Sequence, residues 1–237
     1  VFIAITSYLA FTSIEFMGDK VKKQLAESRA TNNRFGSALK DFQDISESVT
    51  KNSDINKDTV YNDLMKFYGN NENAFECVIK KFDLKCSLEY LLNFYRTHKP
   101  KLIFSKSNTI LLNELKAKGV KLCVLTDGRI IQQQNKIEAL GISSYFSEII
   151  ISEEFGSEKP NIRNYKHFEN IFGIGDYYYI GDNIKKDFIS PNRLNWTTIC
   201  LINNGCNIHE QNFNVPQEYL PTHKVLDLIE VTEVLKI

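Results

Sequence analysis

Two carboxylates with two lysines between them follow an apolar run in the second half of the chain. The run Tyr177–Ile180 stops at Gly181, Asp182 comes next, and Asp187 lies five positions further on. Such a run is typical of a buried strand, and the glycine–acid step is typical of the loop at its carboxyl end, where open α/β sheets bind ligands. Carboxylates there suit a hard cation such as Mg²⁺, which takes one or two carboxylates together with water and substrate phosphate. The alternative is a surface loop with solvated charges.

A threonine ends another apolar run, in the sequence Leu125-Thr126-Asp127-Gly128. A threonine at the carboxyl end of a strand, just before a helix, can offer its hydroxyl and the neighbouring backbone N–H groups to a phosphate oxygen. Thr126, Asp127 and Gly128 are therefore candidates for phosphate binding. A plain turn is the alternative, because Asp-Gly is a common turn pair.

Lys159 is a further candidate, since Lys159-Pro160 follows a run of three isoleucines. Its ammonium can neutralise a phosphate at the mouth of the sheet, although most lysines are simply solvated. Thr126, Lys159 and the Asp182/Asp187 pair each follow a predicted strand, so we expect them to face the same edge of a parallel sheet. Together they predict a phosphate site with a metal more strongly than any one of them does.

The elements that must position these residues alternate between strands and helices. Apolar runs predict strands, and amphipathic stretches ending at glycine or at the chain's end predict helices. The predicted strands are 1–5, 120–126, 148–152, 177–180 and 197–202, and the predicted helices are 108–118, 129–140, 164–172 and 224–235. This alternation indicates a parallel sheet covered by helices on both faces.

Residues 12–58 are polar and their pattern is hard to interpret, whereas 59–98 contain no convincing strand. We expect helices near Glu15–Ala26 and Ser37–Ser48 and over most of 59–98, with a break at Gly69-Asn70-Asn71 and an end at Pro100. The stretch 59–98 is therefore predicted to be helical.

The composition excludes several classes of protein. Formal net charge is zero in 237 residues and no apolar run approaches 18 residues, so we expect neither a nucleic-acid partner nor a membrane span. The five cysteines show no paired spacing, which favours a reducing compartment and a cytoplasmic protein. The sequence gives no indication of oligomeric state.

The three motifs resemble those of the haloacid dehalogenase-like (HAD) hydrolase superfamily. Val124–Gly128 is similar to the second motif, Lys159-Pro160 to the third, and Gly181–Asp187 to the fourth, and the resemblance extends from Asn93 to Gly205. It implies an α/β fold, a Rossmann-like HAD parallel sheet with an inserted, mainly helical cap. The core would then be 1–11 and 101–237, and the cap 12–100.

The resemblance also implies roles for the candidates. Thr126 would hold the transferring phosphoryl group, and Lys159 would stabilise its charge. Asp182 would bind Mg²⁺, and Asp187 would support the metal or the lysine. In the family an aspartate attacks phosphorus, and water hydrolyses the aspartyl-phosphate that results.

The chain departs from the family at the first motif, Asp-x-Asp-x-Thr-Leu, which is absent from the first hundred residues. Aligning Val1–Leu9 on its apolar run and on Leu9 puts Ala4 in the nucleophile's place and Thr6 in that of the acid/base. Either the motif lies upstream of Val1, or Val1–Ile5 is the central strand with its acids lost. We favour the second, because an empty central position would leave two rows of backbone groups unpaired.

The expected function is that of a Mg²⁺-dependent phosphatase acting on a small phosphorylated metabolite, inactive in this chain if the nucleophile is missing. The alternative is a non-catalytic module that binds phosphate or a sugar phosphate. A carboxylate located before the cap would favour the phosphatase, and its absence would favour the binding module.

Overall fold

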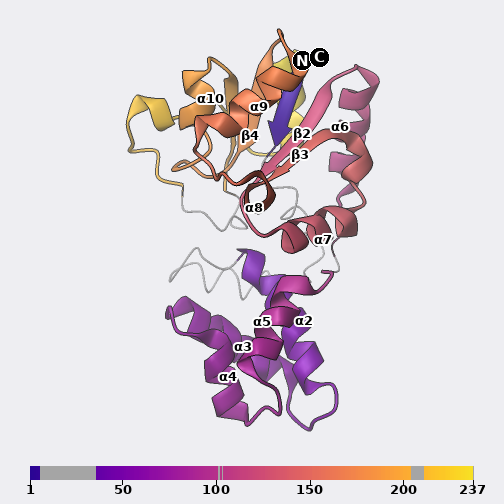
Figure 1. The fold of residues 1–237 in the computed structure, drawn as a ribbon, viewed down its shortest axis with the longest axis vertical. Helices are drawn as coiled ribbons and strands as arrows, with labels where there is room; N and C mark the ends of the chain where they lie inside the picture. The colour runs from indigo at the N-terminus through magenta and orange to yellow at the C-terminus, as the bar shows by residue number, and fades with distance from the viewer. Residues whose placement is uncertain (6–35, 101, 103, 204–210, 237) are drawn as a thin grey trace.

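A six-stranded sheet forms the centre of the core in the computed structural model, which describes residues 1–5, 36–100, 102, 104–203 and 211–236 (Figure 1). Its order is β3-β2-β1-β4-β5-β6, and every neighbouring pair is parallel. The strands are β1 (Phe2–Ile5), β2 (Lys121–Thr126), β3 (Phe146–Ile151), β4 (Tyr177–Gly181), β5 (Thr197–Leu201) and β6 (His223–Val225). The predicted α/β class and parallel sheet are therefore confirmed.

Helices cover both faces of this sheet. They are α6 (Lys106–Ala117), α7 (Ile130–Leu140), α8 (Ser152–Phe155), α9 (Ile162–Phe172), α10 (Ile189–Arg193) and α11 (Val231–Leu235), with 3₁₀ turns at Ser143–Tyr145, Gln217–Tyr219 and Leu228–Glu230. Alternate strand residues point to opposite faces. Ile3 and Ile5 accordingly join one apolar cluster, whereas Ala4 joins a second with Cys123 and Tyr179.

The chain after 223 corrects one prediction. In place of a helix over 224–235, the structure has the short strand β6, a 3₁₀ turn and α11. β6 forms because its backbone pairs with β5, with His223 opposite Ile199 and Val225 opposite Leu201. Three residues carry too little periodicity to predict a strand, so only tertiary pairing reveals it.

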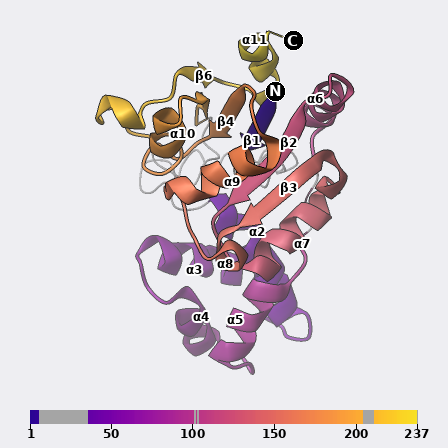
Figure 2. The ribbon, with the colours of Figure 1, turned by 45° about the horizontal axis from the view of Figure 1, so that its top comes forward.

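The cap is a separate group of helices below the core in Figure 1, and the carboxyl ends of β1 to β4 point toward it (Figures 1 and 2). Its helices are α2 (Gly36–Thr50), α3 (Lys57–Gly69), α4 (Ala74–Phe82) and α5 (Leu88–Thr97). Asn56, Asn73 and Ser87 begin α3, α4 and α5 by accepting hydrogen bonds from backbone N–H groups of the first turn. The cap has an apolar cluster of its own, which includes Ile45 and Leu64.

The helix predicted at 37–48 is confirmed as α2, whereas the one near Glu15–Ala26 lies outside the described residues. The limits given above for the cap, 12 and 100, stay a prediction. No helix in the described part of the chain is both long and apolar enough to cross a membrane.

The end of α5 is fixed to the core by α7. Asn135 Nδ2 donates to the carbonyl oxygens of Thr97 at 2.8 Å and His98 at 3.1 Å, and Gln132 Nε2 donates to that of Tyr95 at 3.3 Å. On its other side the His98 ring lies 3.2 Å from a carboxylate oxygen of Asp41 in α2. Residues on α7 therefore attach the end of α5 to the core.

Candidate active site

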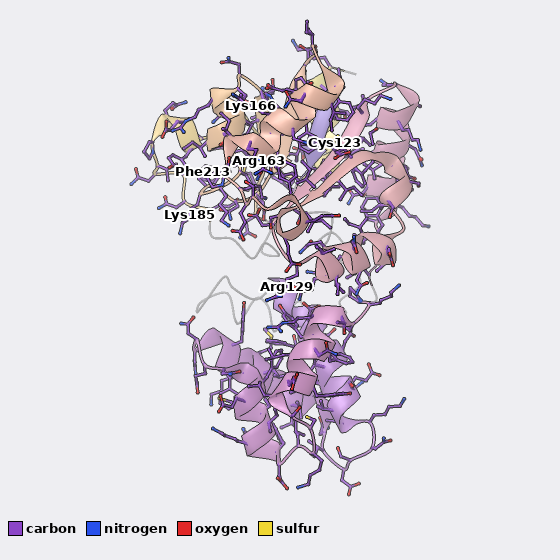
Figure 3. The ribbon with its side chains drawn as sticks, in the orientation of Figure 1. Cys123, Arg129, Arg163, Lys166, Lys185 and Phe213 are labelled. Carbon is purple, nitrogen blue, oxygen red and sulfur yellow. The ribbon has the colours of Figure 1, made fainter. Side chains whose placement is uncertain are left out.

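The predicted site residues meet at the carboxyl edge of the sheet. Thr126 ends β2, Lys159 lies in the loop after β3 and α8, and Asp182 directly follows β4. Lys159 Nζ is 2.8 Å from Asp187 Oδ1, which joins the third and fourth motifs. Arg129, immediately before α7, lies on the side of the core that faces the cap in Figure 3.

Lys159 and Asp187 form a buried ion pair, with side chains 6% and 0% exposed. Burial alone would lower the pKa of Lys159, but the charges of Asp187 and Asp127 outweigh it and raise that pKa above its ordinary value. The ammonium is therefore charged at neutral pH and held in one position. The alternative interpretation of the sequence, that Lys159 is a solvated surface lysine, is therefore excluded.

Asp187 also shapes the loop after β4. Its Oδ2 accepts the backbone N–H groups of Asp182 at 3.1 Å and Asn183 at 2.9 Å. A Cβ at Gly181 would lie 2.5 Å from the same oxygen, so only glycine allows the carboxylate this close to the strand. The spacing of glycine and acid that the sequence shows is therefore required by the geometry of the loop.

Asp182 differs from Asp187 because one of its carboxylate oxygens has no partner. The side chain is 3% exposed, and Oδ2 accepts no hydrogen bond from any described residue. Burial and the charge of Asp187 raise the pKa of Asp182 to about 7, against the opposing charge of Lys159. A buried carboxylate oxygen without a hydrogen-bond donor is available to bind a cation.

These residues fit a Mg²⁺ ion held by one protein carboxylate. Within the described ranges no group of three His, Cys, Asp or Glu side chains could hold a metal. Mg²⁺ needs no such group, because water and substrate phosphate complete its octahedron around one or two carboxylates. Asp182 is the residue that would hold the ion.

The loop after β2 is tied down by polar contacts that the motif alone does not reveal. The Thr126 hydroxyl donates to Gln133 Oε1 at 3.1 Å, and the Gly128 N–H donates to Ser152 Oγ at 2.9 Å. Asp127 accepts the Lys159 N–H at 2.9 Å. In this structure Asp127 and Gly128 hold the loop together, and their direct contact with phosphate stays a prediction.

Two residues near the site were missed at the level of sequence. Gln133 lies in the first turns of α7, and Lys186, between the two acids of the fourth motif, has its Nζ 3.2 Å from Asp127 Oδ2. A polar residue one or two turns into the helix that follows a motif loop is the signal that could have found Gln133. The partner of Lys186, Asp127, is evident only once the loop is folded.

The central strand confirms one prediction and overturns another. Val1–Ile5 does supply the strand between β2 and β4. However, Ala4 lies opposite Cys123 and Tyr179, three residues before Thr126 (126 − 123) and Asp182 (182 − 179). The prediction that Ala4 takes the nucleophile's place is therefore wrong.

The error arose because the alignment was anchored on Leu9. How far along the sheet a strand residue lies is set instead by its backbone pairing with the neighbouring strands. Ile5 is the last described residue of β1 and lies opposite Val124 and Ile180, so two further residues are needed to reach the level of Thr126 and Asp182. Those residues, including Thr6, lie outside the described part of the chain. Residues 1–5 themselves bring no carboxylate to the edge.

Comparisons with known proteins point to one family. The family model described as "Haloacid dehalogenase-like hydrolase" matches residues 40–201, more than half of the chain. A glyceraldehyde 3-phosphate phosphatase of Methanocaldococcus jannaschii is 32% identical over 151 residues, which are 60% of this chain and 66% of that protein. An N-acylneuraminate-9-phosphatase of Mus musculus is 35% identical over 88 residues, which are 36% of this chain and 35% of that protein.

The chain thus spans about two thirds of the first relative and about one third of the second. Among solved structures, a HAD-type protein of Bacillus subtilis bound to magnesium superposes with a TM-score of 0.55 and 18% identity, covering 100% of this chain and 98% of the other. At that identity the likeness establishes the fold alone.

Proposed function

Because the chain belongs to the haloacid dehalogenase-like hydrolase family, we propose that it is a phosphohydrolase that binds Mg²⁺ through Asp182 and acts on a small phosphorylated metabolite. The observation that carries this proposal is the convergence of Thr126, the Lys159–Asp187 pair and the unpartnered oxygen of Asp182 at one sheet edge. The phosphatases of small phosphorylated molecules among its relatives support the substrate class.

Each residue has a role that follows from its chemistry. The Thr126 hydroxyl donates a hydrogen bond to a phosphoryl oxygen, and the Lys159 ammonium neutralises charge on the equatorial oxygens as it develops. Asp187 positions that ammonium. A bound Mg²⁺ supplies further charge neutralisation at the phosphate. Since Lys159 is fixed before substrate arrives, no reorganisation is needed during the reaction.

A second candidate function follows from the central strand. β1 brings no carboxylate to the edge within residues 1–5, and the family mechanism needs an aspartate there. A module that binds phosphate or a sugar phosphate without hydrolysing it would use the same Thr126, Lys159 and Asp182. The two proposals differ only in turnover.

The test measures hydrolysis of p-nitrophenyl phosphate and binding of inorganic phosphate, each with and without Mg²⁺. Asp182→Asn is compared with Asp176→Asn, a matched change of an exposed acid just before β4 at the opposite edge of the sheet. Mg²⁺-dependent hydrolysis lost only in Asp182→Asn supports the hydrolase. Phosphate binding without hydrolysis, again lost only in Asp182→Asn, supports the binding module. If wild type shows neither, both candidates fail.

We also propose that the protein is cytoplasmic. The described cysteines are free thiols, and Cys123 and Cys200 among them are buried, as in proteins of reducing compartments.

A further inference from the structure

Three consecutive glutamines in α7 face three different environments. Gln132 donates to the backbone of the cap, Gln133 contacts Thr126, and Gln134 is exposed. The contact of Gln133 is with the one hydroxyl that the proposed function assigns to the phosphoryl group. Its amide also lies close over Gly128, since a Cβ built on that glycine would be 2.7 Å from Gln133 Nε2.

The direction of this hydrogen bond has a chemical consequence. The Thr126 hydroxyl has one hydrogen and two acceptors within reach, Gln133 Oε1 at 3.1 Å and, at the longer distance of 3.4 Å, the carbonyl oxygen of Asp127. To donate to a phosphate oxygen instead, the hydroxyl must turn away, and its oxygen then needs a donor because Thr126 is 1% exposed. A glutamine amide carries a donor and an acceptor on one group, so it can serve the hydroxyl in both states.

We propose that Gln133 is a positioning residue for the phosphate site, which accepts the Thr126 hydroxyl when the site is empty and donates Nε2 to Thr126 Oγ1 when an anion is bound. This inference rests on the proposed function. It adds a residue on α7 to the set that the sequence motifs assign. Glycine at 128 is required by its positive φ of +140°, and the absence of a side chain there leaves room for the Gln133 amide.

The same helix connects this residue to the cap. Gln132 and Asn135 hold the end of α5 from the neighbouring positions of α7. Any shift of α7 therefore changes the position of Gln133 over Thr126 together with the seating of the cap. A purely structural role for Gln133 predicts a loss of stability without a specific loss of anion affinity.

The experiment measures binding of inorganic phosphate by calorimetry in the presence of Mg²⁺. Gln133→Met keeps the length of the side chain and removes both hydrogen-bonding groups. Gln133→Glu keeps the acceptor and removes the donor. Gln134→Met and Gln134→Glu are matched controls on the same helix. The thermal midpoint of each variant is recorded, so that misfolding is recognised.

We expect Gln133→Met to weaken phosphate binding about tenfold, which equals about 1.4 kcal/mol. Gln133→Glu weakens it further, because it can no longer donate to Thr126 and adds a negative charge beside the anion. Both Gln134 variants bind like wild type. In a Thr126→Val background Gln133→Met should have no additional effect, because the hydroxyl through which it acts is gone.

The outcomes separate this inference from the proposed function. If wild type does not bind phosphate, the proposed function fails and this inference fails with it. If wild type binds and the Gln133 variants bind equally well, or if Gln133→Met has the same effect in the Thr126→Val background, only the positioning role is overturned.

Discussion

Replacing Ala4 with aspartate tests the register of the central strand, because two interpretations of the sequence predict opposite results. If Ala4 occupied the nucleophile's place, Ala4→Asp would put a carboxylate at the sheet edge, where it is tolerated. In the structure Ala4 is 3% exposed and packs in one apolar cluster with Cys123 and Tyr179. We therefore expect the substitution to destabilise the core strongly.

The size of the effect follows from protonation. An aspartate buried among apolar groups stays neutral, so at pH 7 its pKa must be raised from about 3.9 to 7 or above, at about 1.36 kcal/mol per pH unit, or about 4 kcal/mol in total. Overpacking adds about 1–3 kcal/mol. The sum is comparable with the whole stability of many domains, about 5–15 kcal/mol.

Urea unfolding followed by the fluorescence of Trp196 measures this effect, because Trp196 is the single tryptophan and is buried against Tyr177 in the core. Ala4→Val is the matched control, since it adds volume without charge. The difference in unfolding free energy between the two variants should grow as pH rises from 4 to 7, because the folded state then holds a proton that the unfolded state releases. Equal unfolding midpoints for Ala4→Asp and Ala4→Val at pH 7 would refute the register.

Two further predictions concern ion pairs. Asp187→Asn leaves the buried Lys159 ammonium without its carboxylate and should lower the free energy of unfolding in urea by about 3–5 kcal/mol. A decrease below about 1 kcal/mol, as for a surface pair, would contradict the burial of this pair. Burial alone would lower the pKa of His98, but Asp41 and Asp44 outweigh it and raise that pKa. His98 therefore stabilises the cap below about pH 6.5, and this contribution is lost as pH rises through the folded pKa. His98→Gln should reduce the stability difference between pH 6 and pH 9, and an unchanged difference would exclude His98 as its source.

The sequence predicted the layers of the core well, for a physical reason. Strands buried on both faces must be apolar throughout, and helices that cover them must be amphipathic, so 120–126 and 129–140 were recognisable from their own residues. The same holds for Lys159 and Asp187, because parallel strands end at the same edge. Local residues cannot predict the register between one strand and its neighbour.

That limit explains the errors in the central strand and at the end of the chain. Ala4 and β6 are both defined by pairing with strands more than twenty residues away in sequence. Gln133 and Lys186 were missed for a related reason. Each is an ordinary polar residue on a helix or loop, and only the folded loops after β2 and β4 bring Gln133 to Thr126 and Lys186 to Asp127.

The charges of the described site determine how phosphate can bind. Asp127, Asp182 and Asp187 carry three negative charges and Lys159 and Lys186 two positive ones, so the ionised site is −1 (−3 + 2). Because the pKa of Asp182 is raised to about 7, the charge of these five groups at neutral pH lies between −1 and zero. A phosphate dianion therefore meets no net positive charge, and both lysines are already paired. A divalent cation at Asp182 changes the sum to +1. Phosphate and Mg²⁺ should accordingly strengthen each other's binding, as linkage requires, and this holds for a binding module as well as for a hydrolase. Phosphate affinity that is the same with and without Mg²⁺ would show that Asp182 does not hold the ion beside the anion.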